Sequence, residues 1–392
     1  MANQLLFSLL LATSPVVSES TPLPLVMSGH TKSELATLEQ TPPAKVAELS
    51  AERKKKLVDR LAAEIERKYV FPEVGVSIAK QLKARSEKGN YSSIKHPLEF
   101  ATQLTKDMQE IARDKHLNVF YYPAKQEDEN ENTAANDKSV SKVNEKPSED
   151  EIEKRRNAAI NHFRKLNYGV RRVEHFDGNV AYLDLFMIGD LAYVHKGLTA
   201  ALTLVEGSDA MIIDLRDNTG GSPETVEFIV SHFVPQPTHI MDNYRRDDNS
   251  IRQSWTRSNL SVPVYDERKM VYILTSQKTF SAAEDLAYTM QALKRAKIVG
   301  ETTGGGAHAG IRFHLDENFT AFIPNQRSIS PLTKSNWEGV GVVPDLSVDA
   351  NKALLIARIE ILQTLLKKVL DPTQRSEIVE SILALKFELK KM

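Results

Sequence analysis

The chain has 392 residues, of which 41% are hydrophobic and 26% are charged, proportions that are ordinary for a globular protein. Its length suits one large domain with a satellite, or two domains. The formal net charge of −1 gives no electrostatic basis for binding nucleic acid or a membrane surface. The absence of cysteine excludes a thiol nucleophile, a disulfide framework and a cysteine-bound metal.

The first 44 residues are predicted to form a disordered leader. Residues 14–44 are rich in Ser, Thr and Pro and have no hydrophobic period. Residues 5–12 form an apolar run typical of a signal peptide, but no Lys or Arg precedes the run, and it is too short to span a bilayer. Two alternatives therefore stay open: an exported protein, periplasmic or secreted, if the run is a signal peptide, and a cytoplasmic protein otherwise.

Residues 45–125 are predicted to form a small helical domain. Three segments, at 53–69, 78–87 and 98–112, have the apolar spacing of helices, with Ser50 as the cap of the first. The third helix runs directly into His116, which precedes a short alternating strand. Most histidines fill surface or core positions, so the location of His116 at a junction facing a domain boundary gives only modest support for a catalytic role.

Residues 126–150 are polar and charged without an apolar period, and we expect a disordered insertion. The α/β catalytic core is predicted over residues 151–350, because apolar strands alternate with helices and this order favours parallel pairing. The predicted strands lie at 179–187, 209–218, 270–276 and 296–303, the predicted helices include 191–205, and residues 311–324 read as a hairpin. Residues 351–392 are predicted to be one or two amphipathic helices with a break near Pro372.

Ser281 lies where the strand at 270–276 turns into a helix, and two interpretations of its hydroxyl are open. The first is an N-cap, with Glu284 three residues later completing a capping box. The second is a nucleophile that projects from a tight turn, with the N–H of Ala282 directed at the oxyanion formed on attack. The setting resembles a nucleophile elbow, although the sequence GxSxG is absent.

Gly220 and Gly221 form a second turn at the end of a strand, the edge of an α/β sheet where functional turns collect. The pair is either a plain strand-to-helix turn or an oxyanion hole whose N–H groups approach a ligand without an intervening Cβ. The glycine motifs that bind phosphate are absent. His30, His308 and His314 lack metal-ligand spacing, so no metal and no other cofactor is predicted.

Together these motifs resemble the tail-specific, or C-terminal processing, serine protease family. The likeness is greatest to the branch related to interphotoreceptor retinoid-binding protein and the tricorn protease core. The matching segments cover most of residues 47–350: YVFPE at Tyr69, DKHL at Asp114, GNVAYLDL at Gly178, IIDLRDNTGGS at Ile212, TSQKTFSAAEDLAYTMQ at Thr275, KIVGETTGGGAH at Lys297 and WEGVGVVPD at Trp337.

The resemblance implies a crotonase-like β/α spiral core with a small N-terminal helical domain. It also implies a serine-type peptidase that acts on polypeptides through an acyl-enzyme. At matching positions Ser281 would be the nucleophile, His116 the base and Glu338 the acid that orients the histidine. The implied oxyanion hole consists of Gly220 or Gly221 and the amide of Ala282.

The chain departs from the family pattern at several positions. Many members use a lysine base in a TxGKG loop, but this loop reads TTGGGAH, with Gly305 or Gly306 in place of the lysine, which favours a histidine base. The tricorn pattern has a serine just before its histidine, where this chain has Lys115. The chain also has no PDZ segment between the helical domain and the core.

Two other functions remain open. The family includes retinoid carriers, so one alternative is a non-catalytic binding module for an apolar ligand such as a retinoid or a fatty acid. The other is an esterase that uses the same residues on small esters. The presence of serine, histidine and glutamate together favours an enzyme. The sequence gives no prediction of the oligomeric state.

Overall fold

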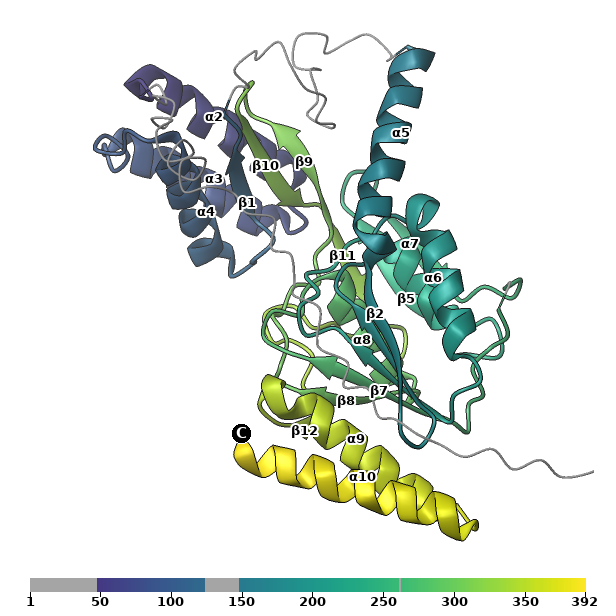
Figure 1. The fold of residues 1–392 in the computed structure, drawn as a ribbon. Coiled ribbons are helices and arrows are strands. Elements are labelled where there is room, and N and C mark those ends of the chain that lie inside the picture. Colours follow the sequence, from purple (N-terminus) through teal and green to yellow (C-terminus); the bar gives the residue numbers. More distant parts are fainter. Residues whose placement is uncertain (1–47, 124–147, 261) are drawn as a thin grey trace, which may run out of the picture. The chain divides into compact units, whose positions relative to one another are not determined.

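The computed structural model describes residues 48–123, 148–260 and 262–392 (Figure 1). The predicted leader at 1–44 lies outside these residues, as does nearly all of the predicted insertion at 126–150. Within the described ranges, no helix is long and apolar enough to cross a membrane.

Three helices follow one another at the N-terminal end of the described chain, as the apolar spacing predicts. They are α2 (Ala51–Lys68), α3 (Pro72–Glu87) and α4 (Pro97–Ala112). The hydroxyl of Ser50 accepts the N–H of Arg53 and caps α2, as expected. Pro72 is the first residue of α3, where the missing N–H of proline is not needed.

A three-stranded antiparallel sheet completes the core of this helical part. Its order is β1 (Asn118–Tyr121), β10 (Phe319–Pro324) and β9 (Gly310–His314). The strands β9 and β10 are the predicted hairpin, whose turn lies at residues 315–318. Side chains such as Phe319 and Ala321 of β10 pack against Phe100 and Leu104 of α4. The helices therefore share their core with strands from a distant part of the sequence.

The main sheet has six strands and is mostly parallel, so the predicted α/β class is confirmed at this level. Only β2 pairs antiparallel, with β3. In spatial order the strands are β12 (Leu346–Ser347), β8 (Lys297–Gly300), β7 (Met270–Thr275), β4 (Ala210–Asp214), β3 (Val180–Leu185) and β2 (Val170–Phe176).

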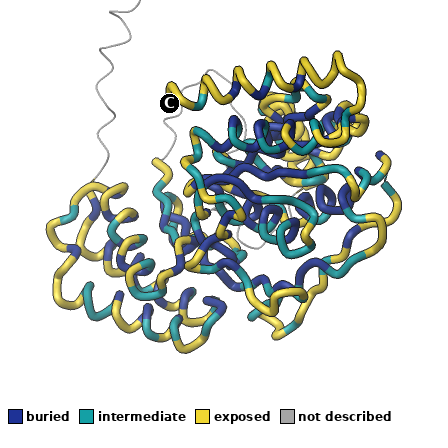
Figure 2. Tube along the Cα trace, turned by 90° about the horizontal axis from the view of Figure 1, so that it is seen from below, coloured by how far each residue is buried: buried dark blue, intermediate teal, exposed yellow. Residues whose placement is uncertain are grey.

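Both faces of this sheet are buried. One face carries Ala181 and Leu183 and packs against three helices: α6 (Leu191–Val205), α7 (Pro223–Ser231) and α8 (Ala282–Ala292). The other face carries Val180 and Tyr182 and packs against α9 (Ala350–Leu366) and α10 (Pro372–Lys391). Figure 2 shows the buried strands lying between these helices, whose outer sides are exposed. Burial on both faces explains why the strands read as continuous apolar runs.

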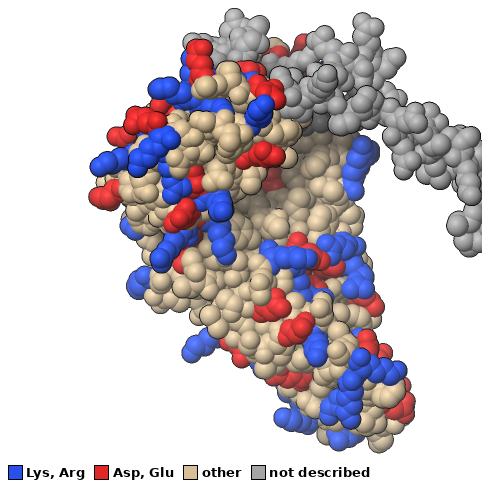
Figure 3. All heavy atoms as spheres, turned by 90° about the vertical axis from the view of Figure 1, so that its left-hand side faces the viewer, with Lys and Arg blue, Asp and Glu red and all other residues tan. Residues whose placement is uncertain are grey.

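The remaining elements are a helix, a 3-10 turn and a second antiparallel sheet. The helix α5 (Glu149–Lys165) starts at a capping box formed by Ser148 and Glu151 and buries none of its residues. It is followed by the 3-10 turn η1 (Asn167–Gly169). A second antiparallel sheet has the order β11 (Gln326–Ile329), β5 (His239–Arg245) and β6 (Ser250–Trp255). On the face drawn in Figure 3, basic and acidic side chains are interspersed, with no large area of one sign.

Candidate active site

Ser281 occupies a strained backbone position immediately before α8. Its φ is 54° and its ψ is −123°, a conformation that residues with a side chain rarely adopt. The turn after β7 leads into this residue, and the helix begins at Ala282. Such strain persists only where the surrounding structure enforces it, and it concentrates at functional sites.

A buried carboxylate, that of Glu284, holds the Ser281 turn in place. It accepts the N–H of Ser281 at 2.9 Å, which forms this half of the predicted capping box. It also accepts the N–H groups of Gly305 at 2.7 Å and Gly306 at 2.8 Å, and the hydroxyl of Thr303. Burial raises the pKa of Glu284, although these four donors oppose the shift. The glycine loop and the serine turn are therefore tied together through one side chain.

The turn at Gly220 lies directly against Ser281, as expected for two turns at the carboxyl ends of neighbouring strands. A Cβ on Gly220 would lie 2.8 Å from Cβ of Ser281 and 2.9 Å from the nitrogen of Ala282. The N–H of Gly220 donates to Asn218 at 2.8 Å. Among the described residues, no acceptor takes the N–H of Gly221 or of Ala282. These two amides are therefore the donors left free beside the serine.

His116 comes from the turn between α4 and β1, and it is 9% exposed. Its ring packs against Phe280, the neighbour of Ser281, with ring centroids 4.5 Å apart. The glycine at position 306 leaves room for this packing, because a Cβ there would lie 2.6 Å from Cε1 of His116. Burial lowers the pKa of His116 to about 4, so the imidazole is neutral at neutral pH and can accept a proton.

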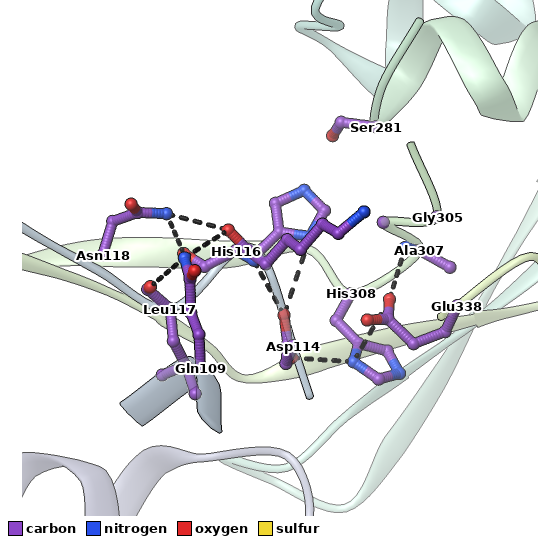
Figure 4. A network of polar contacts seen from close by, with 12 residues as sticks. Gln109, Asp114, His116, Leu117, Asn118, Ser281, Gly305, Ala307, His308 and Glu338 are labelled. Carbon is purple, nitrogen blue, oxygen red and sulfur yellow. Dashed lines mark hydrogen bonds and ion pairs between the residues drawn. The ribbon is translucent and has the colours of Figure 1, made fainter. Parts of the chain in front are cut away.

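The hydrogen bonds expected of a catalytic triad are not formed in this structure. Neither ring nitrogen of His116 has a hydrogen-bond partner among the described residues, so neither Ser281 nor Glu338 bonds to it. The carboxylate beside His116 is instead that of Asp114. Its Oδ1 accepts the backbone N–H of His116 at 2.9 Å and lies 3.9 Å from the ring Nδ1. In Figure 4 the imidazole lies between Ser281 and Asp114.

Glu338 faces a different histidine, His308. Its Oε2 accepts the N–H of Ala307 at 2.6 Å and lies 3.4 Å from Nδ1 of His308. The same Nδ1 lies 2.9 Å from Oδ2 of Asp114 (Figure 4). Asp114 and His308 were not singled out as site residues from the sequence, although both lie inside the quoted motifs DKHL and TTGGGAH.

The two carboxylates of this cluster have opposite pKa shifts. Burial and the charge of Asp114 raise the pKa of Glu338 to about 7. Burial also opposes ionisation of Asp114, but the hydrogen bond and charge of His308 outweigh it and hold the pKa of Asp114 below its ordinary value. Asp114, His308 and Glu338 offer ligand atoms within 4.8 Å of one another, so a metal ion could be held there.

Comparison with known proteins places the chain in a family. The sequence model of peptidase family S41 matches residues 179–348, and the model of the N-terminal domain of peptidase S41 in eukaryotic IRBP matches residues 44–160. The chain belongs to peptidase family S41, as its motifs indicated.

Two curated relatives are carboxyl-terminal-processing enzymes. The chain is 28% identical over 173 residues to the carboxyl-terminal-processing protease of Synechocystis sp., covering 44% of this chain and 38% of that protein. It is 29% identical over 138 residues to the chloroplastic carboxyl-terminal-processing peptidase 2 of Arabidopsis thaliana, covering 35% of this chain and 25% of that protein. The matched regions thus span well under half the length of these relatives.

A solved structure supports the fold independently of sequence identity. The crystal structure of mature CPAF superposes with a TM-score of 0.51 at 11% identity, covering 82% of this chain and 99% of that chain. At this identity the likeness shows a shared fold.

Proposed function

We propose that this protein is a serine peptidase that cleaves polypeptide chains through an acyl-enzyme on Ser281. The observation that carries the proposal is the strained backbone of Ser281, held by Glu284 beside the free amides of Gly221 and Ala282. The family and the carboxyl-terminal-processing names of its relatives support a polypeptide substrate.

In the proposed mechanism, the neutral imidazole of His116 takes the proton of the Ser281 hydroxyl as the oxygen attacks the scissile carbonyl carbon. A serine hydroxyl is a poor nucleophile until a base removes this proton. The serine and the histidine are not hydrogen-bonded here, but the ring of His116 packs against Phe280, the residue before Ser281. Catalytic hydrogen bonds often tighten only when substrate binds. The imidazolium then gives the proton to the leaving amine, and water releases the acyl group by the same path.

The tetrahedral intermediate would place its negative oxygen against the amides of Gly221 and Ala282. Gly220 contributes by having no Cβ, which leaves the serine turn and this pair of amides close together. Its own N–H is already bonded to Asn218, so Gly221 is the better donor of the predicted pair. One oxyanion donor typically lowers the barrier by about 3 kcal/mol.

Glu338 remains the proposed orienting acid, acting at a distance from His116 rather than through a direct bond.

The crotonase-like spiral also remains a proposal, supported by the consecutive parallel pairs of β3, β4, β7 and β8. The relatives are compatible with an exported protein, and export stays a proposal as well.

A fluorophosphonate probe tests the nucleophile directly, because it reacts covalently with an activated serine. We expect the purified full-length protein to be labelled and Ser281→Ala not to be labelled. Ser93→Ala is the matched control, since Ser93 is exposed and distant in sequence from Ser281, and it should label like the wild type. Unchanged labelling of Ser281→Ala would refute the assignment.

The same preparation separates the peptidase from a ligand carrier and from an esterase. Apolar rings of Phe280 and Phe322 surround His116, a setting in which an apolar ligand could also bind. Saturable binding of a fatty acid or a retinoid, without cleavage of any unfolded polypeptide and without labelling, would favour the carrier. Hydrolysis of small esters but of no polypeptide would favour the esterase.

A further inference from the structure

We propose that His308 is a positioning residue that holds the Asp114 carboxylate against His116 and links it to Glu338. The inference rests on the proposed function, because it concerns how the base of that reaction is oriented. Four side chains form a series in the order Glu338, His308, Asp114 and His116, which we call the four-residue cluster (Figure 4). Glu338 is partly exposed, and the other three are buried.

The two oxygens of Asp114 have different partners. Oδ1 faces His116, accepting its backbone N–H at 2.9 Å and lying 3.9 Å from its ring Nδ1. Oδ2 lies 2.9 Å from Nδ1 of His308 and accepts the hydroxyl of Tyr69 at 3.0 Å. Because His308 and Tyr69 hold Oδ2, Oδ1 stays directed at His116, where it can accept a hydrogen bond from Nδ1–H when the two groups move closer.

His308 is itself fixed in place. Its side chain is 6% exposed, and its ring meets Phe71 edge-on with centroids 5.3 Å apart. Its Nδ1 lies between two carboxylate oxygens, at 2.9 Å from Asp114 and 3.4 Å from Glu338. An N–H donor between two carboxylates reduces the repulsion between them, so both can stay close together.

Loss of His308 should change the electrostatics at His116 in a defined direction. The titratable groups that face the two imidazoles are Asp114, Glu338 and Tyr69. The charge of His308 contributes to the lowered pKa of His116, and its hydrogen bond contributes to the lowered pKa of Asp114. Without His308, both groups should bind protons more readily, and a protonated Asp114 orients His116 poorly.

The experiment compares three variants of the full chain, with kcat and KM measured for a fluorogenic polypeptide across the pH range. We expect His308→Ala to lower kcat by roughly 10- to 100-fold, by analogy with the loss of an outer hydrogen-bond partner at metal sites, with a smaller effect on KM. The acid limb of the pH–rate profile of His308→Ala should move to higher pH. His308→Gln should recover part of the rate, because its amide N–H can donate to Asp114. His314→Gln, an exposed histidine on β9, should match the wild type.

A second readout does not depend on turnover. The ring pKa of His116 is measured by NMR titration in Ser281→Ala and in Ser281→Ala combined with His308→Gln, and we expect a higher value in the combined variant. An active wild type whose kcat, pH profile and His116 titration are all unchanged by the His308 substitutions would overturn the inference. Activity that a chelator removes and a divalent cation restores would also overturn it, since the cluster would then be a metal site.

The proposed function fails differently. If the wild type neither cleaves polypeptide nor reacts with the fluorophosphonate, His116 has no proton transfer to perform, and both proposals are rejected together. If the wild type is active and the His308 variants behave like it, the serine peptidase assignment stands and only the positioning role is rejected.

Discussion

The carboxylate of Glu284 receives the backbone N–H of Ser281 at 2.9 Å while it is fully buried. A buried carboxylate is costly unless its oxygens are hydrogen-bonded, and here two loop glycines and Thr303 supply the remaining donors. The helix cap anticipated from the sequence thus also joins the serine turn to the loop at Gly305. One residue therefore stabilises the site and fixes the backbone conformation of Ser281, the proposed nucleophile.

Glu284→Ala should destabilise the protein strongly. The substitution leaves the buried amides of Gly305 and Gly306 without an acceptor, and each such loss costs about 1–3 kcal/mol. We expect the free energy of unfolding to fall by about 3–5 kcal/mol in urea titrations. Glu380→Ala, on the exposed side of α10, is the control and should change it by less than about 0.5 kcal/mol. Equal effects of the two substitutions would contradict the role given to Glu284.

Gly220→Ala should abolish activity, because the new methyl group would lie 2.8 Å from both Cβ of Ser281 and the carbonyl oxygen of Phe280. The φ of Gly220 is also +105°, which favours glycine. We expect at least about a 100-fold loss of kcat/KM, because shifting this turn would displace the adjacent amides of Gly221 and Ala282, and loss of one oxyanion donor has an effect of that order. The control is Gly207→Ala, where a Cβ meets no atom within 4 Å. Near wild-type activity of Gly220→Ala would show that the turn is not part of the site.

Glu338→Gln should make the protein more stable at alkaline pH while lowering its turnover. The folded pKa of Glu338 is about 7, above its ordinary value of 4.5, so the folded state retains a proton that the unfolded state loses. Stability from this group is therefore fully present below about pH 4.5 and is lost as the pH rises to about 7. Glutamine cannot ionise and avoids this loss.

The measurement is the free energy of unfolding of both proteins at pH 4 and pH 8. Relative to the wild type, Glu338→Gln should gain about 3 kcal/mol in the free energy of unfolding between pH 4 and pH 8, since one pKa unit corresponds to about 1.4 kcal/mol. A difference that is the same at both pH values would mean that Glu338 titrates normally in the folded protein.

Much of the fold could be predicted from local patterns. The apolar strand before Ser281, the helix at 191–205 and the hairpin that forms β9 and β10 all appear as expected. The pairing of β10 with β1 could not be predicted, because it joins Val119 to Ala321 across about two hundred residues and leaves no local period. The hairpin of β5 and β6 was also missed, since its strands are mixed in polarity and half exposed.

In the candidate site, too, some contacts could be predicted from the sequence and others could not. The contact between Gly220 and Ser281 follows from topology, because carboxyl ends of neighbouring parallel strands meet at one edge. The contact between Asp114 and His308 does not, since it depends on how a turn after α4 meets the glycine loop. Family resemblance pointed to Glu338 beside His116, whereas the structure places His308 and Asp114 between them.

Acylation of Ser281 can be observed by mixing the full-length protein with a small activated peptide ester, quenching in acid and mapping the modified peptide by mass spectrometry. The account predicts an acyl adduct on Ser281 in the wild type. It also predicts formation at least about 100-fold slower in His116→Ala, the usual contribution of a general base. An adduct on another residue, or an equal rate of acylation in His116→Ala, would contradict it.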